Sequence, residues 1–381
     1  MRSRADVRAM LARCAIAAAM TGCSVENISL SPPPKPPAPG SYGACGATTT
    51  ALARLPGALP WLGMDEFNVY AMSAPGGGGT GPQVIWRVPK DGSPPVELAR
   101  SPTPITGLVL SSPDLETVSG VIWSTAGDAG VDGGATGAIL SVGLDGGVAP
   151  MVLAAGREMP TAVVTVGSQV YWAEQGIDDL GDPVEAIMAT STAGGPVTRL
   201  QEVGRDETPT AIGASVYSGT DVDGSFVPSG SIFWTTWDPR LENQTSAEIV
   251  ICPFPTPFGP LARLGGPDAG GAGAVAYDPF AAFDFSASDV IASVRPDVDG
   301  GWVTRTLATT PGFVGAVQNY GTSLYFIRPG TTTLVTATRG LEDAQALQVV
   351  AHGVDPWTFL LDSTCVYWVD TDAGAIAMVA Q

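Results

Sequence analysis

The chain has 381 residues, and 18 Lys or Arg against 37 Asp or Glu give it a formal net charge of −19. Because this charge would repel a phosphate backbone, nucleic acid is excluded as an expected partner. The hydrophobic share of 45% suffices for a core, while 48 Gly and 33 Pro disfavour long helices, so the composition predicts an all-β protein of many short strands.

The first 24 residues, MRSRADVRAMLARCAIAAAMTGCS, combine a basic start, a short apolar run and small residues, which is typical of an export signal. The apolar run is too short to span a bilayer. Its ending MTGC resembles the lipobox of bacterial lipoproteins, although Met20 departs from the usual Leu, Val or Ile. The resemblance implies removal of residues 1–22, lipid on Cys23 and, because Ser24 is not Asp, sorting to the outer membrane of the cell envelope. An ordinary secretory signal with an incidental Cys23 is the alternative.

Residues 23–45 follow as a linker that contains the Pro-rich run SLSPPPKPPAPGSYG. Proline favours the extended polyproline II conformation, which rises roughly 3 Å per residue. We therefore expect a semi-rigid stalk between a lipid anchor and a folded body of residues 46–381.

An apolar, aromatic strand pattern recurs along that body. Seven copies align on one position, at intervals of 52, 49, 62, 58, 34 and 42 residues: NVYAM at Tyr70, GVIWS at Ile122, QVYWA at Tyr171, SIFWT at Phe233, DVIAS at Ile291, SLYFI at Tyr325 and CVYWV at Tyr367. A strand-built repeat of about fifty residues indicates a propeller, a solenoid or a tandem array.

The order of strands within each repeat favours the propeller. A Pro-led apolar strand such as TPITGLVLS precedes the aromatic strand, and a third strand such as GAILSVGL and a fourth such as PVELARS follow it. Four short consecutive strands make an antiparallel blade. The unit around Ile291 is the weakest, so six blades is the alternative to seven.

The two ends of the body complete one another. Residues 48–65, TTTALARLPGALPWLGMD, read as a fourth strand followed by a first strand, whereas the chain stops at GAIAMVAQ after only three strands. We expect the N-terminal strand to complete the last blade and so remove an exposed sheet edge.

The repeats resemble those of the YWTD-type and related propellers, over roughly residues 46–381. Tyr171-Trp172-Ala173-Glu174 and Tyr367-Trp368-Val369-Asp370 carry the resemblance best, while the units at Ile291 and Tyr325 depart from it. The motif implies a fold with aromatic residues packed between blades. It implies no activity, because propellers include both binding proteins and enzymes.

Motifs for chemistry are few, and we predict no catalytic, cofactor-binding or metal-binding residues. His352 is the sole histidine and reads as a turn residue rather than a base or ligand. The loop GAGAVA, residues 271–276, lacks the strand and helix of a dinucleotide site. The DVDG runs at Asp221 and Asp297 do not complete a calcium loop and read as exposed turns.

Three cysteines remain once Cys14 is removed with the signal and Cys23 carries lipid. An oxidising envelope favours pairing, and a bridge from Cys45 to Cys365 would lock the ring. One intervening strand would separate these two by roughly twice 4.8 Å, beyond disulfide reach unless the preceding loop bends across. The pairing of Cys45, Cys252 and Cys365 is therefore left open.

Two classes of function fit these features. The first is a non-enzymatic binding or interaction module for a protein or carbohydrate ligand, displayed on the envelope by its lipid anchor and requiring no cofactor. The second is a propeller enzyme that acts on sugars or is a cofactor-dependent oxidoreductase. Asp and Glu show no repeated placement that would converge on one site, which favours the binding module.

Overall fold

A computed structural model describes the protein from Cys45 to Ala380 with gaps. The described residues are 45–75, 82–112, 117–127, 136–177, 183–203, 208–220, 226–237, 248–254, 262–264, 277–278, 281–285, 290–296, 302–309, 317–320, 323–327, 331–338, 348–354 and 358–380. Their regular structure is all strand, and none of them forms a helix long and apolar enough to cross a membrane.

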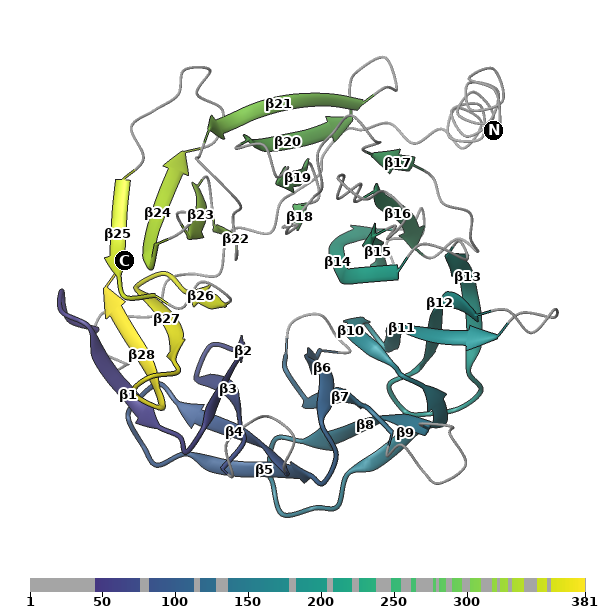
Figure 1. Cartoon of the computed structure of the whole chain (residues 1–381), viewed down its shortest axis with the longest axis horizontal. Helices are drawn as coiled ribbons and strands as arrows, with labels where there is room; N and C mark the ends of the chain where they lie inside the picture. Colours follow the sequence, from purple (N-terminus) through teal and green to yellow (C-terminus); the bar gives the residue numbers. More distant parts are fainter. Residues whose placement is uncertain are drawn as a thin grey trace.

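The strands form seven four-stranded antiparallel sheets arranged in a ring (Figure 1). Blade 1 consists of β2 (Ala58–Met64), β3 (Asn68–Ser73), β4 (Gln83–Pro89) and β5 (Val96–Ser101), and blade 2 of β6 (Ile105–Ser111), β7 (Gly120–Thr125), β8 (Thr136–Gly143) and β9 (Met151–Glu158). Blade 3 consists of β10 (Thr161–Val166), β11 (Gln169–Ile177), β12 (Pro183–Ser191) and β13 (Thr198–Val203). Blade 4 consists of β14 (Thr208–Thr220), β15 (Phe226–Trp237), β16 (Glu248–Phe254) and β17 (Ala262–Leu264).

Blade 5 consists of β18 (Tyr277–Asp278), β19 (Ala281–Phe285), β20 (Val290–Pro296) and β21 (Trp302–Thr309). Blade 6 consists of β22 (Val317–Tyr320), β23 (Ser323–Ile327), β24 (Thr333–Thr338) and β25 (Gln348–His352). Blade 7 consists of β26 (Phe359–Leu361), β27 (Cys365–Asp370), β28 (Ala375–Ala380) and, from the start of the chain, β1 (Thr50–Arg54). The four strands of a blade are called A to D from the centre outward. One face of the disc, the A–B face, carries the A–B and C–D turns. The other, the B–C face, carries the B–C and D–A connections.

The predicted ring closure is confirmed. β1 is the outer strand of blade 7 and pairs with β28 from Thr50 opposite Met378 to Arg54 opposite Ala375. Figure 1 shows the N-terminal strand beside the C-terminal strand at the rim. The seven-blade prediction is therefore correct, and the six-blade alternative is wrong.

One aligned position was misplaced. Ile291 lies in β20, the third strand of blade 5, whereas the second strand is β19. Taking Phe283 of β19 as the aligned residue changes the irregular intervals of 58 and 34 residues to 50 and 42. The alignment failed here because Val290-Ile291 of β20 match the Val-Ile of the repeated pattern, whereas Asp284 interrupts β19.

Cys45 and Cys365 form a disulfide, with their Cα atoms 6.0 Å apart. The chain before β1 bends across the end of β28, where the amide of Ala380 donates to the carbonyl of Gly46 over 3.0 Å. This bend spans the intervening strand and places Cys45 at the start of β27. The described N-terminal end is thus fixed to the A–B face of blade 7.

The repeated aromatic pair fills the interfaces between blades. Tyr171 packs in a cluster with Ile232 of blade 4, whereas Trp172 packs with Ile122 and Ile139 of blade 2. Adjacent residues of a strand point to opposite faces of its sheet, so each pair covers both neighbouring interfaces. This two-sided burial explains why a simple apolar–polar alternation is missing from the sequence.

We expect deletion of residues 46–55 to lower the melting temperature by at least about 5 °C or to cause aggregation, because it removes β1 and exposes the edge of β28. The loss should amount to several kcal/mol, a large part of a domain's total of about 5–15 kcal/mol. Deletion of residues 29–40 should leave the melting temperature unchanged. Equal melting of the two deletion variants, measured by circular dichroism, would contradict the closing role of β1.

Candidate functional site

The inner strands of blades 1 to 4 each contain an irregularity at the B–C face. Their pairing register shifts between Leu59 and Leu62 in β2, Ile105 and Gly107 in β6, Thr161 and Val164 in β10, and Pro209 and Ala211 in β14. Such bulges are enriched at barrel rims and next to functional sites, where they redirect side chains. Figure 1 shows the four strands that carry them, β2, β6, β10 and β14, innermost around the centre of the ring.

The bulges of blades 2 and 3 are in contact with each other. The bulged Thr106 is exposed, and its hydroxyl donates to the carbonyl of Pro160 over 2.5 Å while lying 2.9 Å from the hydroxyl oxygen of Ser124. Gly107 lies so close to the next bulge that a Cβ there would be 2.9 Å from the backbone nitrogens of Ala162 and Val163. The two inner strands therefore meet backbone to backbone.

Met159 and Ala162 have backbone conformations that L-residues rarely adopt. Their φ angles are 42° and 47°, and the side chain of Met159 is 49% exposed. Strain of this kind persists where neighbouring contacts enforce it, and it is concentrated at functional sites. Here the contact of Thr106 with Pro160 holds the residue that follows Met159. The result is a large apolar side chain presented outward from a rigid turn.

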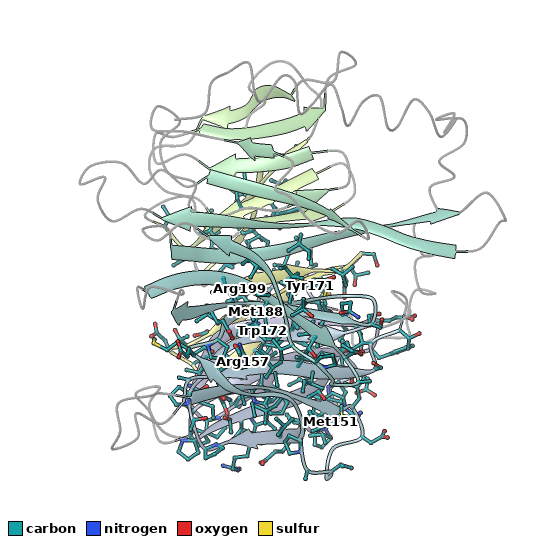
Figure 2. The ribbon with its side chains drawn as sticks, turned by 90° about the vertical axis from the view of Figure 1, so that its right-hand side faces the viewer. Met151, Arg157, Tyr171, Trp172, Met188 and Arg199 are labelled. Carbon is teal, nitrogen blue, oxygen red and sulfur yellow. A yellow bond between two sulfur atoms is a disulfide. The ribbon has the colours of Figure 1, made fainter. Side chains whose placement is uncertain are left out.

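A buried ion pair lies beside this turn and joins blades 2 and 3. Two guanidinium nitrogens of Arg157 of β9, Nε and Nη2, donate to the carboxylate of Glu174 of β11, Nε over 2.9 Å. The hydrogen bond to Glu174 raises the pKa of Arg157. The indole nitrogen of Trp172 donates to the same carboxylate over 2.8 Å. Figure 2 shows Arg157 and Trp172 close together at this interface. Glu174 is only 5% exposed, so this carboxylate is desolvated, and its partner Arg157 lies two residues before Met159 in the chain.

The equivalent tryptophans of two other blades lack this support. Trp123 and Trp368 are buried, and their indole nitrogens have no hydrogen-bond partner. The residue two places after each is Thr125 or Asp370, whose side chains are shorter than that of Glu174. Among the described blades with this tryptophan, blade 3 therefore differs in chemistry as well as in backbone.

The A–B face carries a second interblade network at the closure. Lys90, which follows β4, is only 3% exposed and forms a 2.9 Å ion pair with Asp362 of blade 7. The same carboxylate accepts a 2.9 Å hydrogen bond from the hydroxyl of Tyr367, whose ring centroid is 5.2 Å from the Lys90 ammonium. Its other oxygen accepts from the amides of Thr364 and Cys365. This network joins blade 1 to the turn that holds the disulfide.

Burial alone would raise the pKa of Asp362, but the hydrogen bond and charge of Lys90, with the two backbone amides, outweigh it and lower the pKa to about 2. Burial and the neighbouring Asp362 both raise the pKa of Tyr367, so its hydroxyl remains a donor. A similar pair occurs in blade 1, where Tyr70 donates to Asp65 over 2.6 Å. The A–B turns of blades 1 and 7 thus follow the same pattern: each has an Asp whose carboxylate accepts a hydrogen bond from the hydroxyl of the Tyr five residues later.

The residues singled out in the sequence are not assembled into a site. His352 ends β25 and is exposed, with its Nδ1 atom 3.3 Å from the hydroxyl of Thr333. Within the described ranges, no group of three or more His, Cys, Asp or Glu residues could hold a metal ion. Cys23, Asp221, Asp297 and residues 271–276 lie outside the described residues, and so does the side chain of Cys252.

Comparison with known proteins shows the fold alone. No protein-family model matches the chain. No curated protein matches it either. Among solved structures, the WD40 propeller domain of Doa1 is 12% identical, with a TM-score of 0.51 over 89% of this chain and 97% of that domain. The propeller domain of Cps50 (Swd1) from Myceliophteria thermophila is 10% identical, with a TM-score of 0.50 over 88% of this chain and 100% of that domain.

A puromycin hydrolase is also similar, with 13% identity and a TM-score of 0.54 over 88% of this chain. This chain covers only 55% of the hydrolase. At such identities the similarity supports the β-propeller architecture and transfers no activity.

We expect Lys90→Met to destabilise the protein by about 2 kcal/mol, because it leaves the Asp362 carboxylate buried without its cation. Arg100→Met is the matched control: its pair with Glu97 is exposed and should contribute well under about 1 kcal/mol.

The same pair predicts a dependence on pH. Since the folded pKa of Asp362 lies below its usual 3.8, its stabilisation is complete above about pH 4 and is lost as pH falls towards 2. Urea denaturation at pH 6 and pH 2.5 should show the wild type losing about 2 kcal/mol more than Lys90→Met. Parallel losses in both proteins would show that the pair is not responsible.

Proposed function

We propose that this chain is a non-enzymatic binding module displayed on the bacterial cell envelope, and that its B–C face around Met159 is the binding surface. The observation that carries the proposal is Met159, an exposed residue with a positive φ angle that is held by the contact of Thr106 with Pro160. The Arg157–Glu174 ion pair joins the same two blades two residues earlier in the chain. Because the backbone that carries this exposed apolar side chain is already fixed, binding does not have to order the turn, which favours a protein partner.

The position of Cys45 supports the same arrangement. The residues before Cys45 join the body at the A–B face, where the disulfide fixes them. A lipid on Cys23 and a Pro-rich stalk would therefore hold the disc by the A–B face. The B–C face is then free for a partner.

The alternative is a propeller enzyme that acts on sugars or uses a redox cofactor. Such an enzyme needs converging carboxylates or cofactor-holding basic groups near the centre of the ring. No observation on the described residues favours this alternative over binding, whereas the strained Met159 turn favours binding. We therefore propose the binding role.

We expect the mature protein to start at Cys23, to carry lipid there and to fractionate with outer membranes. Mass spectrometry of the N-terminal peptide measures this directly. Cys23→Ser should release the protein from the membrane fraction. An unmodified Cys23, or a start after it, would remove the anchor from the proposal without affecting the binding surface.

The binding surface is tested with a photo-crosslinking amino acid at Glu158, which is exposed beside Met159. On intact cells it should yield a discrete protein adduct, and the same probe at Ser93, on the opposite face, should not. Met159→Gly should reduce the adduct at least tenfold. Met151→Gly should not, because Met151 is equally exposed at 48% but lies at the opposite end of β9, on the A–B face.

The two glycine variants also differ in stability. Met159→Gly relieves a positive φ and should raise stability by up to about 1 kcal/mol, whereas Met151→Gly, within β9, should lower it by about 0.5–1 kcal/mol. Loss of crosslinking in a variant that is not destabilised would therefore report binding and not unfolding. Adducts of equal yield from both faces would overturn the proposal.

A further inference from the structure

A small recess opens on the A–B face between blades 2 and 3. Its volume is about 150 Å³, and its polar lining comes from the ends of β6, β7 and β8 and from the residue after β12: Ser111, Ser119, Gly120, Ser141, Gly143 and Thr192. It lies on the face opposite to Met159. It belongs to neither the proposed binding surface nor the closure network.

Two paired glycines open the recess. Gly120 of β7 lies opposite Gly143 of β8, and Ser111 of β6 lies opposite Gly120. A Cβ at Gly120 would come within 2.6 Å of the carbonyl of Val142, so packing excludes a side chain there. A Cβ at Gly143 would meet nothing within 4 Å. A side chain at residue 143 would therefore fit without a clash, so packing alone does not explain the open space beside Gly143.

The same place in the ring is filled at the closure of blades 7 and 1. Thr192 follows the third strand of its blade as Lys90 does, and Ile122 is the third residue of β7 as Tyr367 is of β27. At the closure, the long side chains of Lys90 and Tyr367 occupy this interblade position. Their shorter counterparts leave the corresponding volume empty between blades 2 and 3.

The lining determines which ligands are suitable. Ser111, Ser119, Ser141 and Thr192 bring four hydroxyl groups, each able to donate and to accept a hydrogen bond. The remaining lining residues are Gly, Val and Ile, so no charged side chain is present to compensate an ionic ligand. The volume is below the roughly 300 Å³ of sites for drug-sized ligands, which restricts the ligand to about one ring.

We propose that this recess binds a single neutral, polyhydroxylated ring, such as a terminal pyranose of a glycan. The glycine backbone allows the ring to approach closely, the hydroxyl groups of the lining exchange hydrogen bonds with those of the ring, and Ile122, whose side chain faces blade 3, contacts its apolar face. Because the recess is on the A–B face, this inference does not depend on the binding surface around Met159.

Saturation-transfer NMR on the full chain tests the proposal with methyl α-D-glucopyranoside at about 10 mM, above the millimolar affinity of a single-ring contact. The glycoside should receive saturation, and glucuronate, a charged ring of the same size, should bind at least tenfold more weakly. Gly143→Leu, which projects a side chain into the recess, should abolish the signal. Ser93→Leu, elsewhere on the same face, should leave it unchanged.

Thr192→Val keeps the shape of the side chain and removes one hydroxyl group. It tests the same recess with a conservative substitution, so the test does not depend on correct folding of Gly143→Leu. It should weaken binding about fivefold, the equivalent of one hydrogen bond of about 1 kcal/mol. Retention of the signal in Gly143→Leu, equal binding of glucuronate, or no saturation transfer to the glycoside would each overturn the proposal. None of these outcomes bears on crosslinking from the opposite face.

Discussion

The pairing of β1 with β28 is the interaction on which the rest of the structure depends, because it converts an open row of blades into a ring. In an open row, β28 would present an unpaired edge and blades 1 and 7 would each expose an apolar face. Three different kinds of bond cross this seam: the strand pairing itself, the Cys45–Cys365 disulfide, and the buried pair of Lys90 with Asp362. The disulfide and the ion pair meet at the turn before β27, whereas the strand pairing runs along the outer edge of the same blade, so blade 7 is held on both sides.

The other interblade contacts show how one repeated frame supports different chemistry. At positions equivalent in strand and register, the protein places Lys90 and Tyr367 at the closure and the shorter Thr192 and Ile122 between blades 2 and 3. On the opposite face, Glu174 holds Arg157 and Trp172, whereas Trp123 and Trp368 keep unpartnered indole nitrogens. The buried apolar residues maintain the frame, and the turn residues vary without disturbing it. Function in such a fold is therefore sought at the turns and strand ends.

The repeated strands could be predicted from the sequence because their signal is local. Tyr171-Trp172 and Tyr367-Trp368 are consecutive residues that must fill two interfaces, and the split blade follows from unequal strand counts at the two ends. Blade 5 was misaligned because its third strand begins with the Val-Ile of the repeated pattern, whereas Asp284 interrupts its second. The Lys90–Asp362 pair was missed because its partners are far apart in sequence, although the Asp-to-Tyr spacing of five residues in DEFNVY and DSTCVY was visible. The strain at Met159 has no sequence signal, since Met does not favour a positive φ.

The distribution of these features gives the disc two unlike faces. The A–B face carries the closure network and the attachment of the N-terminal residues, and its contacts are strong and mutually satisfied. The B–C face carries the bulges, the strained turn and an exposed methionine, which cost stability. A ring can tolerate such cost on one face because each blade is held by both neighbours, so local strain is shared across two interfaces. Blades 2 and 3 are packed against each other and against blades 1 and 4, so their B–C face keeps a conformation that an isolated sheet would relax.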